Sequence, residues 1–458
     1  MSQITGRFLT GTTMSHVTRM TITGSLGITF MFAVDAANLF WVSLLGVERL
    51  VAALGFAWTI QFFSVSFGMG MMVAVTATVS KLIGRRNLAD ARRQTTVCAI
   101  SGFVMQLLVA AVILIFRHEF LAMAGAKGET AAAAARYLLI SVPALPIMAL
   151  GMVGSAVLRA EGDAYRAMMV TFSSGVVSML IDPLLIFGLG LGLDGAALAV
   201  VAARTLSAAL SLYYVLYVHD FAARISLADF RRMFPPFALI ALPVILTQLS
   251  TPFGNYLLTS VVAGFGDSAV AGWAVVARLT VLAFGGLFAL SGAIGGIFGQ
   301  NYGAGEYVRV KRIYRDAMLF CLIYTLIAWA VLALAADIIL TAFGLSGDAS
   351  EVIIAFTTIA AGGYLFTGAL YVANAAFNSL GRAYYSTVFN WLRDGIFLWP
   401  LAAGISVSFG AAGAIYGHAL SGVLGGGIAA TAGWLFVSRL EARNRPPATP
   451  PTTPVTTA

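Results

Sequence analysis

The chain contains 458 residues, of which 60% are hydrophobic and only 10% are charged, and its mean hydropathy is +0.91. This composition excludes ordinary soluble, disordered, fibrous and disulfide-rich proteins. Long runs that are apolar at nearly every position also exclude a transmembrane β-barrel, whose strands alternate apolar and polar residues. The sequence therefore predicts an all-α protein that crosses a membrane many times.

Twelve apolar stretches follow one another along the chain, each long enough to cross a ~30 Å hydrocarbon core as a helix. They lie at residues 15–45, 49–80, 96–116, 131–157, 167–189, 195–218, 237–264, 269–298, 316–340, 352–378, 385–408 and 411–437. Basic residues gather in the connections after even-numbered stretches, as at 81–93 and 309–315. The positive-inside rule then predicts a multi-pass protein of the cell (inner) membrane with both termini in the cytoplasm. The net charge of +8 follows from this topology, so we expect contact with membrane lipid and no nucleic-acid partner.

Weak sequence similarity between the two halves predicts an internal repeat. The segment 42–46 after the first stretch matches 262–266 after the seventh, and 192–196 matches 410–414, although glycine-rich openings also suit any tight turn. Two halves of six helices each share one orientation, which predicts two lobes related by a pseudo-twofold axis along the membrane normal, with a central cavity between them. The expected organisation is a cytoplasmic segment 1–13, an N-lobe 14–218, a cytoplasmic linker 219–235, a C-lobe 236–437 and a disordered Pro/Thr-rich cytoplasmic tail 438–458.

Two carboxylates fall deep inside the predicted spans. Asp35 lies 11 residues before Gly46, and Asp182 lies 8 residues before Gly190, which places both roughly 12 to 17 Å below the outer surface at ~1.5 Å per residue. A carboxylate that faces lipid at this depth costs on the order of 3 kcal/mol. We therefore expect both side chains to face a cavity or a partner, although Asp182 before Pro183 also fits the cap of a restarted helix.

Two acids at one depth suit reversible protonation or cation binding. The sequence contains no Walker lysine, no zinc-type His/Cys spacing and no Gly-x-Ser-x-Gly elbow, so it does not predict an enzyme or a metal site. Asp394 beside Arg393 is interpreted as a local ion pair, and His418 as a packed histidine.

Several motifs together resemble the multidrug and toxic compound extrusion (MATE) transporters. They are Val34-Asp35, Leu44-Leu45-Gly46, Leu158-Arg159-Ala160-Glu161-Gly162-Asp163, Asp182-Pro183-Leu184-Leu185-Ile186-Phe187 and Gly299-Gln300-Asn301-Tyr302-Gly303. The resemblance extends from about Met14 to Phe436. It implies a twelve-helix, two-lobed antiporter that exports organic cations, drugs or metabolites in exchange for protons or sodium ions.

Within that family, the pattern is similar to the proton-coupled branch, in which aspartates of helices one and five line an N-lobe cavity. Asp35 and Asp182 occupy those motif positions, with Ser178 and Asn38 as supporting polar residues. Ser178 stands where the family usually has asparagine, and Val200 where it usually has threonine. The sodium-coupled branch uses acids in helices seven and ten, where this chain offers the C-lobe polar residues Gln248, Thr251 and Asn255. The coupling ion is thus expected to be a proton, possibly sodium, with no other cofactor.

Aromatic rings and thioethers adapt to varied apolar cations. The candidate walls of the substrate cavity are Phe32, Tyr137, Met148, Met152, Phe172 and Met179, each of which also fits ordinary packing. A lipid-linked saccharide flippase is the alternative, and it would need cationic side chains for a diphosphate, for which only Arg204, Arg278 and Arg393 are candidates. A receptor or scaffold that transports nothing would need neither the acids nor the repeat. The expected form is a monomer that binds a small-molecule substrate.

Overall fold

The computed structural model describes residues 6–343 and 346–444, and within them the chain is helical with no strand. Residues 445–458 of the expected tail lie outside the described residues, and the last helix runs on to Arg443. The first half contains α1 (Thr13–Ser43), α2 (Glu48–Gly84), α3 (Leu88–Ile115), α4 (Arg117–Met123), α5 (Gly128–Ser141), α6 (Leu145–Glu161), α7 (Ala164–Pro183) and α8 (Gly192–Tyr213). The second contains α9 (Leu227–Ala263), α10 (Asp267–Gly303), α11 (Tyr307–Leu334), α12 (Ala336–Phe343), α13 (Asp348–Thr358), α14 (Tyr364–Ser379), α15 (Ala383–Trp391) and α16 (Leu398–Arg443).

These helices account for the twelve predicted spans. Ten continuous helical stretches of the described chain are long and apolar enough to cross a membrane, and α13 with α14, bent by 45°, makes an eleventh. The stretch Ala383–Arg443 is broken at Gly410, whose φ of 58° and ψ of −144° are not helical. This break divides one stretch into two spans and gives twelve. α9 begins at Leu227, inside the range expected to be a linker.

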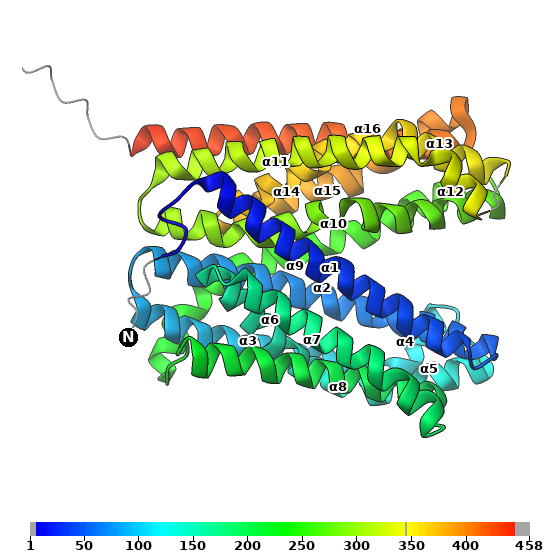
Figure 1. Cartoon of the computed structure of the whole chain (residues 1–458), viewed down its shortest axis with the longest axis horizontal. Coiled ribbons are helices and arrows are strands. Elements are labelled where there is room, and N and C mark those ends of the chain that lie inside the picture. The colour runs from blue at the N-terminus through cyan, green and yellow to red at the C-terminus, as the bar shows by residue number, and fades with distance from the viewer. Residues whose placement is uncertain (1–5, 344–345, 445–458) are drawn as a thin grey trace, which may run out of the picture.

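The first helix of each lobe packs partly into the hydrophobic core of the other lobe. Val17 and Met20 of α1 pack into the hydrophobic core of the second half, and Phe237 and Ile245 of α9 pack into a core of the first half. Figure 1 shows α1 crossing from the side of α11 toward α7 and α8. Each lobe is therefore held to the other by a helix that belongs to both.

α2 and α10 meet closely at the ends where the 85–87 and 304–306 loops follow them. A Cβ on Gly84 would lie 2.0 Å from the carbonyl oxygen of Gln300, and one on Gly303 would lie 2.1 Å from that of Lys81. Only glycine permits this approach, as in other small-residue helix contacts within membranes. We call this end of the molecule the closed end.

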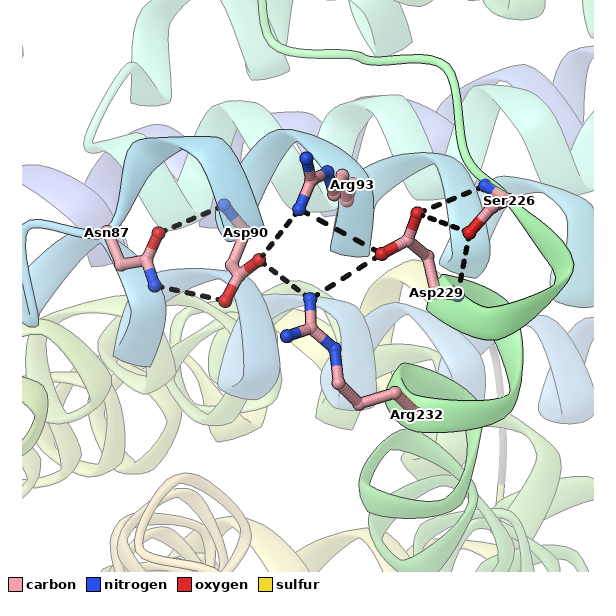
Figure 2. A network of polar contacts seen from close by, with 6 residues as sticks. All are labelled: Asn87, Asp90, Arg93, Ser226, Asp229 and Arg232. Carbon is pink, nitrogen blue, oxygen red and sulfur yellow. Dashed lines mark hydrogen bonds and ion pairs between the residues drawn. The ribbon is translucent and has the colours of Figure 1, made fainter.

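A polar network at the closed end joins the first turns of α3 and α9 (Figure 2). Arg232 of α9 lies 2.9 Å from Asp90 of α3, and Arg93 of α3 lies 3.9 Å from Asp229 of α9. Ser226 caps α9 by accepting a hydrogen bond from the Asp229 backbone N–H. The start of the second lobe is thus fixed to the first.

Candidate functional site

Asp35 lies on the side of α1 that faces away from its outer apolar surface. The helical repeat of 100° per residue places Asp35 opposite the exposed Leu26. The same repeat places it near Asn38, three residues later. Asp35 itself is exposed, whereas Asn38 is half-buried. The two residues thus share one face of α1 but differ in their burial.

Asp182 is buried completely, with 0% of its surface exposed. Its Oδ1 accepts a hydrogen bond of 3.1 Å from the Asn38 amide, while its Oδ2 is buried without a partner among the described residues. Ser178, one turn earlier, is also buried but is not bonded to it. An unpaired carboxylate oxygen in such a place is costly, and a proton bound there removes that cost.

The local backbone explains the position of Asp182. Asp182 and Pro183 are the last two residues of α7, so the alternative in which Asp182 caps a new helix is wrong. The chain continues as the π-helical turn Leu184–Gly188. Pro183 has no N–H to donate to the preceding turn, which loosens the regular helix at the acid.

A buried polar group beside the aspartates comes from three further helices. Arg204 of α8 donates hydrogen bonds to Gln61 Oε1 at 2.6 Å and to the Ser141 carbonyl at 2.8 Å, and the Gln61 amide donates to Ser141 Oγ at 2.8 Å. The charge of Arg204 acts on Asp35, and buried Tyr137 lies within electrostatic range of both acids and of Arg204. The group therefore places one fixed cation within electrostatic range of Asp35 and one hydroxyl within range of both acids.

The other predicted wall residues differ in their burial and surroundings. Phe32, Met148 and Met179 are half-buried, and Met152 lines a small packing void with Gly68 and Gln106. Phe172 is exposed, and its ring centroid lies 4.4 Å from that of Phe30.

The predicted polar residues of the C-lobe are spread along α9. Gln248 reaches across to the Met69 sulfur of α2 at 3.7 Å, while Thr251 and Asn255 are exposed. Their spacing of three and four residues places all three on one face of α9.

The ion pair between Arg393 and Asp394 in the C-lobe is buried. Arg393 Nε lies 2.6 Å from Asp394 Oδ1, and both side chains are buried. Ser250 adds a hydrogen bond of 3.1 Å to Asp394 Oδ2. The arginine and aspartate thus form the local pair that their sequence positions predict. His418 packs edge-on against the Trp273 and Tyr364 rings.

Sequence reasoning did not assign Arg204, Gln61 or Ser141 to the acid cluster. Arg204 is visible in the sequence as a charge inside a span, but no spacing rule connects α8 to α1. Gln61 and Ser141 carry no signal, because uncharged polar residues are common in apolar helices.

Comparisons with known proteins agree with this fold. The sequence profile of the family described as MatE matches residues 21–184 and 243–402. A FAD transporter of Shewanella oneidensis is 27% identical over 84% of this chain and 86% of its own length. The multidrug export protein MepA of Staphylococcus aureus is 26% identical over 53% of this chain and 54% of its own.

Solved structures share the architecture. A crystal structure of a MATE mutant has a TM-score of 0.89 at 22% identity and covers 96% of this chain and 99% of its own. A MOP superfamily transporter from Pyrococcus furiosus has a TM-score of 0.88 at 23% identity, over 95% of this chain and 98% of its own. These likenesses confirm the twelve-helix, two-lobed fold and the resemblance that the motifs indicated. The chain belongs to the MatE family, and it is a multi-pass membrane transporter of the efflux type, not an enzyme.

Proposed function

We propose that this transporter exports a small organic substrate in exchange for protons, which bind at Asp35 and Asp182. The observation that carries the proposal is the buried Oδ2 of Asp182, which has no partner among the described residues, while Oδ1 bonds to Asn38, one turn of α1 after the exposed Asp35. Asp35 exchanges protons with water, and Asp182 holds one inside the lobe. Protonation of Asp182 changes the carboxyl group to which the Asn38 amide of α1 is hydrogen-bonded. Protonation is thereby linked to the packing of α1.

Arg204 favours a proton over sodium as the coupling ion. A sodium ion needs several oxygen ligands, and Arg204 already occupies Gln61 Oε1 and the Ser141 carbonyl oxygen through its hydrogen bonds. A proton, in contrast, needs only one carboxylate oxygen. We therefore assign the coupling to protons and propose no other cofactor.

The basic connections of the sequence support an orientation in the cell membrane. Lys81, Arg85 and Arg309 belong to the closed end, which the positive-inside rule places in the cytoplasm together with both termini. The structure then corresponds to a state closed toward the cytoplasm. We expect it to act as a monomer.

The relatives suggest two classes of substrate. A multidrug exporter and a FAD transporter are both similar to this chain, so we propose organic cations and flavin nucleotides as candidates. The flippase alternative is less supported, because Arg204 and Arg393 are engaged in hydrogen bonds and an ion pair inside their lobes.

Transport by purified protein in liposomes tests the coupling. Asp35→Asn and Asp182→Asn should each abolish movement of ethidium driven by an imposed pH gradient, because neither amide can bind the coupling proton. Asp337→Asn, which removes an exposed acid of α12, is the matched control and should transport normally. Undiminished proton-driven transport in both aspartate variants would refute the proposal, and a requirement for a sodium gradient would refute the choice of ion.

A further inference from the structure

We propose that Arg278 of α10 binds an anionic group of the substrate, a phosphate in the first instance, in the space between the lobes. This inference rests on the proposed export function and names the substrate class and the residue that recognises it. Four observations carry it: the face of α10 on which Arg278 lies, its depth, its exposure and its lack of a partner.

Arg278 lies on the face of α10 that packs against the first lobe. A Cβ on Gly285 would lie 3.1 Å from Thr29 of α1, and one on Gly24 of α1 would lie 3.3 Å from Ala289. Farther along, Gly299 and Gly303 meet α2. Arg278 precedes Gly285 by seven residues, or two helical turns, so it continues the same stripe. Its side chain therefore points toward the first lobe and not toward lipid.

Arg278 also lies at the depth of the acid cluster. It is 11 residues from Asp267, the first residue of α10, and Asp35 is 8 residues from Ser43, the last residue of α1. At 1.5 Å per residue, Arg278 and Asp35 are roughly 16 Å and roughly 12 Å from the outer ends of their helices. The antiparallel contacts of α1 and α10 at Gly24 and Thr29 lie nearer the closed end than either charge. Beyond those contacts Asp35 lies on α1 and Arg278 on α10, and both residues are exposed.

The guanidinium of Arg278 is exposed and has no hydrogen-bond or ion-pair partner among the residues that the structure describes. The other two arginines of the spans, Arg204 and Arg393, are both engaged within their own lobes. An arginine at this depth is expensive unless water or an anion solvates it. Arg278 is therefore the free cation of the interlobe wall in the described chain.

The chemistry of the guanidinium selects the ligand. Its parallel N–H groups match the oxygens of a phosphate and bind them through charge-assisted hydrogen bonds. A flavin nucleotide carries such phosphates, whereas riboflavin shares the ring and lacks them. A substrate whose phosphate binds Arg278 would be released when the two lobes move apart or when another charged group takes the place of the phosphate at the guanidinium.

Equilibrium binding to the purified full chain in detergent, followed by flavin fluorescence, tests the inference without a pH gradient. The wild type should bind FMN and FAD more tightly than riboflavin. Arg278→Gln should weaken FMN and FAD binding by about tenfold or more, the effect of losing a charge-assisted contact, and should leave riboflavin binding where it was. Arg278→Lys should fall between the two. Arg312→Gln removes an exposed arginine near the start of α11 and serves as the control for the change in net charge.

Three results would overturn the inference: no preference of the wild type for FMN over riboflavin, equal weakening of all three flavins in Arg278→Gln, or no weakening at all. Equal weakening would instead assign Arg278 to holding the lobes together. Because the assay needs no proton gradient, binding that depends on Arg278 can be established even where Asp35→Asn and Asp182→Asn show that coupling does not use protons. The two proposals therefore fail separately.

Discussion

His219 lies between two carboxylates just beyond the π-helical turn that ends at Val218. Its Nδ1 is 2.7 Å from Glu161 Oε2, and its Nε2 is 3.3 Å from Asp163 Oδ2. Arg166 adds a contact of 2.6 Å to Asp163. Hydrogen bonding to Asp163, followed by that to Glu161, raises the pKa of His219 to about 9. A charged histidine thus ties the connection after α8 to the end of α6 and the start of α7.

The raised pKa of His219 predicts how stability changes with pH. The unfolded value is about 6.5, so the stabilisation by charged His219 is complete below about that pH and is lost as the pH rises through about 9. The melting temperature of the wild type should fall across this range, and His219→Gln should flatten that fall. Thermal unfolding in detergent at several pH values measures it. His118→Gln, at an exposed histidine, should behave as wild type, and an unchanged slope in His219→Gln would contradict the assignment.

At the scale of single helices, the capping box at the start of α9 supplies a second prediction. Ser226 Oγ accepts from the Asp229 backbone N–H at 3.1 Å, and the Asp229 carboxylate accepts from the Ser226 N–H at 3.0 Å. Ser226→Ala should lower the free energy of unfolding by about 1 kcal/mol, the usual cost of losing an N-cap. Ser260→Ala, on the exposed surface of the same helix, should cost less. Denaturant unfolding in detergent compares them, and equal losses would show that the cap contributes nothing special.

The helices themselves could be predicted because a membrane span must satisfy its backbone internally and must be long and apolar. What the apolar pattern does not contain is local irregularity. It gives no sign of the π-helical turns at Leu184–Gly188 and Leu392–Phe397, and it places part of the short α12 inside the expected span 316–340. These features depend on packing between helices and not on the composition of one helix.

The candidate site was predictable in part for a similar reason. A carboxylate inside a span stands out because its cost is large, so Asp35 and Asp182 could be identified from sequence. Arg204 and Arg278 are equally visible as charges, yet one packs inside its lobe and the other faces the opposite lobe. That difference comes from the rotation and pairing of α8 and α10, which no single-helix pattern specifies.

For the whole molecule, the two lobes are joined at one end by α1, α9 and the glycine contacts of α2 with α10. Thr13 of α1 donates a hydrogen bond to Asp316 of α11, and Gln300 of α10 bonds to the Ala160 carbonyl of α6 at 2.6 Å. The bonds at this end therefore cross between lobes. In the proposed orientation, export requires the substrate to enter from the side that these contacts close, so they must break and re-form in each cycle.

Gly84→Ala tests this requirement most directly. Its new Cβ would lie 2.0 Å from the Gln300 carbonyl oxygen, and because backbone cannot yield there, α2 and α10 must separate at the closed end. We expect faster hydrogen–deuterium exchange in the last turns of both helices, and slower transport because the closed state is no longer reached. Gly55→Ala, on the same helix with nothing within 4 Å of its Cβ, is the matched control and should exchange and transport as wild type. If the closed end depends on glycine packing, the methyl group forces α2 and α10 apart and hydrogen–deuterium exchange must rise. Unchanged exchange in Gly84→Ala would therefore show that the closed end does not depend on glycine packing.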